Sequence, residues 1–138
     1  MKPTYPQYWP QFYTATIQQW KHLLSVNEYK DIIITTLRFM VGEKRIILFG
    51  FVIMSNHIHL IWQSLHGHSP SSVQSSFMKN TARQMKALLM KNEERALLDY
   101  KVDKYDRKYQ IWKREPLSVE LRTATVFDQK LSYTIIIR

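Results

Sequence analysis

The first part of the chain contains one apolar run that suits a strand, followed by apolar positions at helical spacing. Residues 12–17 are aromatic and β-branched after a proline-rich start, which predicts a first strand. Between residues 27 and 41 apolar positions recur every three or four residues, which predicts a helix that Asn27 caps and Gly42 ends.

A pair of strands is expected next. Residues 45–54 form a continuous apolar run rich in β-branched and aromatic side chains, which predicts a strand buried on both faces. Ser55 and Asn56 turn the chain, and residues 57–62 predict a second strand that pairs antiparallel with the first.

The second half of the chain begins with a polar loop at residues 63–72 and continues into a helix predicted from about residue 72 to 89. This helix has one apolar face that can meet a core and one basic face. The apolar positions are Phe77, Met85, Leu88 and Leu89, and the basic face carries Lys79, Arg83 and Lys86, with Met90 beside them.

The remaining residues predict a short helix around 94–100 and two short strands near 109–113 and 117–121. Residues 125–128 have the spacing of a capping box and open a last helix. The order of elements favours an α+β fold, with a ferredoxin-like or RRM-like antiparallel sheet and helices on one face. We expect residues 1–138 to form one domain.

Composition narrows the chemistry. The 138 residues suit a single domain, and an apolar content of 45% argues against disorder. The chain has no cysteine, which excludes disulfides, thiolate zinc sites and cysteine nucleophiles. Any metal must therefore be held by nitrogen and oxygen ligands.

Charge points to the class of partner. Twenty Lys and Arg against eleven Asp and Glu give a net charge of +9, which favours nucleic acid or an acidic membrane surface. No apolar run approaches the length of about 18 residues that crosses a membrane, and the start lacks the apolar core of a signal peptide. We therefore expect a cytoplasmic protein without a membrane partner.

The most specific motif is His57-Ile58-His59. Side chains alternate along a strand, so both imidazoles project from one face and could share a cation. Mg²⁺ or Mn²⁺ would also require oxygen ligands, such as a phosphate oxygen. The alternative is a pair of partly exposed histidines on a sheet face.

Residues 51–62 resemble the signature strands of the single-tyrosine HUH transposases, which include the REP-associated tyrosine transposases and the transposases of small single-strand insertion sequences. In that signature an apolar run precedes Met-Pro-Asn-His, a hydrophobic residue and a second His, and here Ser55 replaces the proline. Further segments are similar to the branch with a longer C-terminal half, namely residues 12–16 with 20–24, 109–114 and 126–133.

The resemblance implies a metal-dependent enzyme that nicks and joins single-stranded DNA bearing a hairpin. His57 and His59 would hold a divalent metal, Mg²⁺ or Mn²⁺, and Tyr133 would attack the phosphate to leave a 5′-phosphotyrosine bond. A phenol with a pKa of about 10 needs such assistance to act as a nucleophile. Without the resemblance, Tyr133 would be interpreted as a core residue near a helix end.

Basic residues are candidates for contact with the DNA. Lys130 lies one helical turn before Tyr133 and could touch the same phosphate. The basic face formed by Lys79, Arg83 and Lys86 could line the strand path, although such faces also occur simply as solvated surface. His66 and His68 are interpreted as parts of a solvent loop and His22 as structural.

The ending departs from the family pattern. The resembling families place Asn or Gln four residues after the tyrosine as a third metal ligand, whereas this chain has Ile137 there and stops at residue 138. We expect a truncated copy in which nicking is absent or much reduced while DNA binding survives. A monomer or a homodimer is expected. The competing interpretations are a non-catalytic single-stranded nucleic-acid-binding module and a metal-dependent nuclease that uses activated water.

Overall fold

The computed structural model describes residues 7–92, 94–104 and 107–137, except for the side chains of residues 94, 107, 133 and 135–137. Its strands are β1 (Gln11–Thr16), β2 (Ile46–Ile53), β3 (His57–Ser64), β4 (Lys101–Lys104), β5 (Arg107–Tyr109) and β6 (Leu117–Glu120). Its helices are α1 (Asn27–Gly42), α2 (Pro70–Asn92), α3 (Glu94–Leu97) and α4 (Ala124–Ile137), with 3-10 turns at Gln18–Trp20, Leu23–Ser25 and Leu98–Tyr100.

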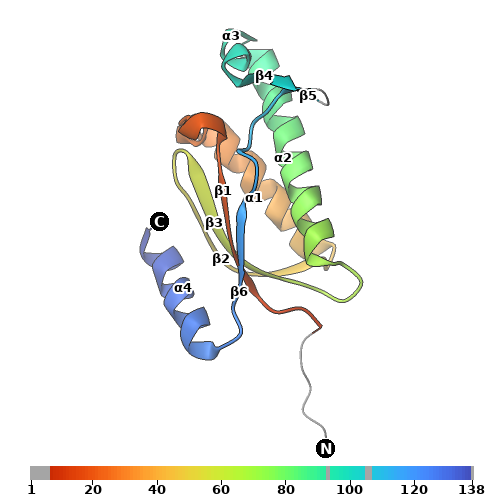
Figure 1. The fold of residues 1–138 in the computed structure, drawn as a ribbon, viewed down its shortest axis with the longest axis vertical. Helices are drawn as coiled ribbons and strands as arrows, with labels where there is room; N and C mark the ends of the chain where they lie inside the picture. The colour runs from red at the N-terminus through yellow and green to blue at the C-terminus, as the bar shows by residue number, and fades with distance from the viewer. Residues whose placement is uncertain (1–6, 93, 105–106, 138) are drawn as a thin grey trace, which may run out of the picture.

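Four strands form an antiparallel sheet in the order β2-β3-β1-β6, and β4 pairs with β5 in a separate hairpin. The chain order β1-α1-β2-β3-α2-β6 with this strand order is the ferredoxin-like arrangement, into which α3, β4 and β5 are inserted. The α+β class predicted from the sequence is therefore confirmed. Figure 1 shows the inserted segment at one end of α2, away from the sheet.

The larger core lies between the sheet and the two helices α1 and α2. Tyr13 of β1 and Leu60 of β3 point into it, together with Ile33 of α1 and Phe77 of α2. The Trp62 and Phe77 rings meet edge to face with their centroids 5.5 Å apart. This packing confirms the predicted apolar face of α2.

Helix α4 packs on the opposite face of the sheet, so the expectation of helices on one face describes α1 and α2 alone (Figure 1). A second, smaller core forms beneath α4 from Phe12, Ile61 and Leu121, with Phe127 and Leu131 of the helix packed on it. Gly50 lets α4 approach β2 closely, because an added Cβ there would lie 3.2 Å from both Leu131 Cδ1 and Thr134 Oγ1.

Strand β2 lies at one edge of the four-stranded sheet, so the prediction of a strand buried on both faces is wrong. Ile47, Phe49 and Phe51 are 41%, 39% and 37% exposed. The run is apolar partly because α4 covers some of it: the Phe49 ring meets Phe127 edge to face at 5.0 Å.

Other differences concern the second half of the chain. The predicted strand at 109–113 is wrong, because β5 ends at Tyr109 and Trp112 makes a single bridge to Ile17. Strand β4 was not predicted. Helix α4 begins earlier than the predicted capping box, with the Val126 amide donating to Thr123 Oγ1. Among the described residues, no helix combines the length and apolarity needed to cross a membrane.

Candidate active site on the outer face of the sheet

His57 and His59 lie on the face of the sheet that carries α4. In the strand pairing, His57 is opposite Thr16 and His59 is opposite Thr14. The two imidazole centroids are 4.9 Å apart, with the rings at 77°. This confirms the prediction that strand alternation brings both rings to one face.

Hydrogen bonds orient each ring through its Nδ1 atom. Thr14 Oγ1 lies 2.9 Å from His59 Nδ1, and Asn56 Oδ1 lies 2.8 Å from His57 Nδ1. A bond of this kind to the far nitrogen sets the tautomer of a metal-binding histidine and raises its basicity as a ligand. In both residues Nε2 is therefore the nitrogen with which a metal ion would be bound.

The surroundings keep both rings neutral. Burial, together with the smaller effects of the charges of His57 and Lys130, lowers the pKa of His59 to about 4. Burial also lowers the pKa of His57. Because a neutral imidazole is the metal-binding form, the pair is ready to accept a cation at neutral pH.

Lys130 connects α4 to this site. The Phe12 ring stacks on His59 with centroids 5.1 Å apart, and the Lys130 Nζ atom lies 4.9 Å from the Phe12 centroid. Of the residues predicted to contact DNA, Lys130 is thus the one placed beside the histidines. Tyr133 belongs to the same helix, but its side chain lies outside the described residues, as does that of Ile137.

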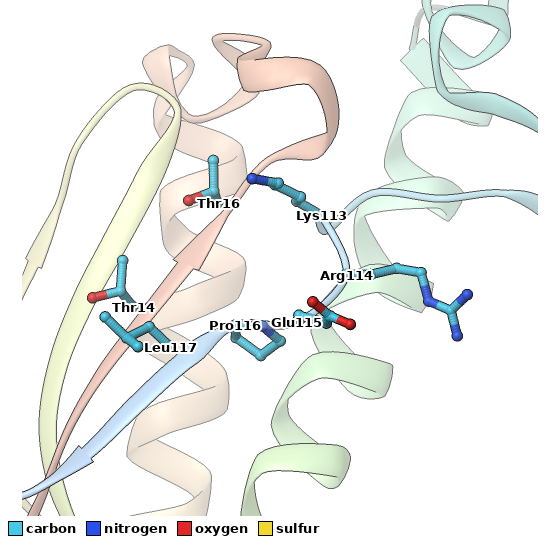
Figure 2. A pocket seen from close by; sticks show the side chains of 7 residues that line it. All are labelled: Thr14, Thr16, Lys113, Arg114, Glu115, Pro116 and Leu117. Atoms are coloured by element: carbon cyan, nitrogen blue, oxygen red, sulfur yellow. The ribbon is translucent and has the colours of Figure 1, made fainter.

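A small cavity of about 180 Å³ adjoins the pair along β1. Thr14 and Thr16 form one wall, and the segment from Lys113 to Leu117 forms the other (Figure 2). Figure 2 shows the Lys113 ammonium directed toward Thr16 and the Arg114 guanidinium directed away from the threonines. The Lys113 Nζ atom also lies 4.5 Å from the Trp20 ring centroid. The cavity holds the charges of Lys113 and Glu115, and Thr14, which lines it, is also the residue that contacts His59.

Sequence reasoning did not single out Thr14, Thr16 or Lys113 as site residues. Strand alternation could have indicated part of this, because residues 12, 14 and 16 share one face of their strand just as residues 57 and 59 share one face of theirs. What the sequence did not contain was the register that sets Thr14 opposite His59.

The basic face of α2 is not part of this site. Lys79, Arg83 and Lys86 lie on the helix that packs against the other face of the sheet. Arg83 Nη2 donates to Asn80 Oδ1 on its own helix. Of the histidines interpreted as non-catalytic, His22 contacts Ser55 Oγ at 2.7 Å through Nδ1, and His66 is exposed in a turn.

The donor set fits a divalent ion in part. Two neutral imidazoles by themselves suit metals such as Zn²⁺, whereas Mg²⁺ and Mn²⁺ prefer oxygen ligands, and no group of three His, Cys, Asp or Glu side chains occurs among the described residues. The positive charge of Lys130 nearby opposes a lone cation at this position. A phosphate would offset that repulsion and supply oxygen ligands, so the arrangement suits a metal ion that binds together with a phosphate.

The fold was compared with known proteins. No protein-family model and no curated protein matches the chain. The structure of the REP-associated tyrosine transposase bound to a REP hairpin matches with a TM-score of 0.63 and 14% identity, over 99% of this chain and 72% of that one. This chain therefore has the same fold as that transposase. A crystal structure assigned as a transposase from Deinococcus radiodurans R1 matches with a TM-score of 0.59 and 16% identity, over 100% and 98% of the two chains.

Proposed function

We propose that this transposase-like chain nicks and joins single-stranded, hairpin-bearing DNA. The observation that carries the proposal is the pair His57 and His59, held 4.9 Å apart on the sheet face that α4 covers. Tyr133 lies on that helix three residues after Lys130, and positions three apart are neighbours on a helix surface. The nucleophile is assigned to this helix because α4 packs on β2 and on β3, the strand that carries the histidines.

The proposed reaction is a phosphoryl transfer. The phenolic oxygen of Tyr133 would bond to phosphorus as the bond from phosphorus to the 3′ oxygen breaks; the phenol loses its proton and the 3′ oxygen gains one. The product is a 5′-phosphotyrosine bond, which a 3′ hydroxyl can reverse to rejoin the strand. A divalent ion on His57 and His59 would neutralise phosphate charge, and Lys130 would neutralise more of it.

The test uses a labelled single-stranded hairpin DNA with Mg²⁺ or Mn²⁺. Because Ile137 stands where the resembling families have a third metal ligand, we expect only a low yield of covalent protein–DNA adduct on a denaturing gel, lost in Tyr133→Phe and in His59→Ala and retained in Tyr100→Phe. Tyr100 is the matched control because it is a buried tyrosine in the turn Leu98–Tyr100, outside the sheet that carries the histidines. Cleavage without an adduct would instead indicate a nuclease that uses activated water.

A non-catalytic module that binds single-stranded nucleic acid is the second candidate. It is favoured by the absence of a third His, Cys, Asp or Glu beside the pair within the described part of the chain. In that case the same assay would give retardation of the DNA on a native gel, with neither adduct nor cleavage, and retardation would be insensitive to EDTA.

A further inference from the structure

The cavity with the largest volume among those described lies away from the histidines, between α2 and the segment 109–112. Its volume is about 480 Å³, within the range of roughly 300–1,000 Å³ typical of small-ligand sites. The cavity beside the histidines, at about 180 Å³, is below that range. By volume, the cavity between α2 and residues 109–112, here called the α2 cavity, is the better match for a small ligand such as a nucleotide base.

The lining of the α2 cavity combines flat apolar walls with positive charge. Its residues are Met78, Lys79, Ala82, Lys86, Tyr109, Gln110, Ile111 and Trp112. Two of them carry ammonium groups and none carries a carboxylate. An aromatic wall beside cations is the combination that holds a base on a ring and its phosphate on lysine.

The cavity is preformed, because hydrogen bonds fix the 109–112 segment on both sides. The backbone N–H of Gln110 donates to the Tyr100 carbonyl at 2.8 Å, and the backbone N–H of Gln18 donates to the Ile111 carbonyl at 2.8 Å. Trp112 Nε1 donates to Thr81 Oγ1 of α2 at 2.9 Å. A ligand would therefore enter without the segment first having to be ordered, which favours binding.

One continuous segment links this cavity to the site on the other face. Residues 109–112 line the α2 cavity and residues 113–117 line the cavity beside Thr14 and Thr16. The crossing occurs between Trp112, bridged to Ile17, and Lys113, whose amide donates to the Thr16 carbonyl at 2.7 Å. A polynucleotide passing along this segment would meet both cavities, whereas a free nucleotide would fill only one.

We infer that the α2 cavity binds one unpaired nucleotide of a single-stranded polynucleotide that also reaches the histidine face. The base stacks against Tyr109, and its flanking phosphates lie on Lys79 and Lys86. The inference rests on the proposed nucleic-acid function but needs neither the metal nor Tyr133, so it is tested separately from the nicking reaction.

The first test measures binding of a labelled single-stranded oligonucleotide in EDTA. We expect Lys79→Ala with Lys86→Ala to weaken binding about tenfold and to reduce the slope of log affinity against log salt by about 1.4, the value for two single-strand phosphate contacts. The matched control is Arg38→Ala with Lys91→Ala, which removes two exposed charges outside the cavity, one from α1 and one from α2. Equal losses in both pairs would overturn the inference, because they would reflect net charge alone.

The second test does not depend on variants that could fold poorly. An oligonucleotide containing iodouracil is cross-linked to the unaltered protein by light, and the modified residues are mapped by mass spectrometry. We expect cross-links on Tyr109 or Met78. Cross-links restricted to the histidine face would overturn the inference. Loss of the Tyr109 cross-link on adding free deoxynucleotides, with oligonucleotide affinity unchanged, would show that the cavity takes free nucleotides and would also overturn it.

Discussion

Thr14→Val should lower the metal affinity of the histidine pair with little change in shape. The substitution replaces the hydroxyl that lies 2.9 Å from His59 Nδ1 by a methyl group. Losing such a partner on a metal-binding histidine typically costs 10- to 100-fold in affinity, and we expect a loss of about that size. Loss of this hydrogen bond should also lower the free energy of unfolding by about 1 kcal/mol.

The assay titrates Mn²⁺ in the presence of a short single-stranded DNA and follows the bound ion by electron paramagnetic resonance. Nitrogen NMR of the His59 ring reports the tautomer, which we expect to change from a single form to a mixture. Thr16→Val is the control. It removes a threonine hydroxyl from the same face of the sheet, and the described contacts include no hydrogen bond between Thr16 and an imidazole. An equal loss in the control, or an unchanged tautomer in Thr14→Val, would refute the reasoning.

Four further outcomes are expected. The pKa of His59 is about 4 in the folded chain and 6.5 in the unfolded chain, so the unfolded chain binds more protons between these two pH values. The urea midpoint of unfolding should therefore fall as the pH is lowered from 6.5 to 4, and it should fall less in His59→Asn. Lys130→Met should raise the pKa of His59 in an NMR titration; no change would exclude the charge effect. Gly50→Val should lower unfolding free energy by about 1–3 kcal/mol and slow adduct formation by displacing α4, whereas Gly42→Val, which meets no neighbour, should leave adduct formation unchanged. Tyr13→Phe should raise unfolding free energy by about 1 kcal/mol, since the buried hydroxyl has no partner among the described residues; a decrease would contradict this.

The sequence predicted well wherever the answer depended on periodicity within one element. The shared face of His57 and His59 follows from strand alternation alone, and the register confirms it. Periodicity does not determine which element covers which face of a sheet. The basic face of α2 and the histidines therefore fell on opposite sides of the sheet, and the edge position of β2 was missed.

The segment at 109–113 was misjudged for a related reason. Its apolar and aromatic residues suggest a strand, yet Ile111 and Trp112 are buried against the helical core and are fixed by individual hydrogen bonds to Gln18 and Thr81. Tertiary contacts of this kind override local preference. The same contacts create the α2 cavity, which no local pattern could have revealed.

The two halves of the candidate site differ in how firmly they are anchored. Strand β3, which carries the histidines, lies between β2 and β1 in the sheet and packs on the larger core, whereas α4 packs on the small cluster of Phe12, Ile61 and Leu121. Local opening favours the element with fewer buried apolar contacts, so α4 should detach at a lower energetic cost than β3 beneath it. Amide hydrogens of α4 would then exchange with solvent long before those of β3. If α4 detached in this way, a DNA strand without a free end could bind beneath the helix from the side and would not need an end to pass through the site.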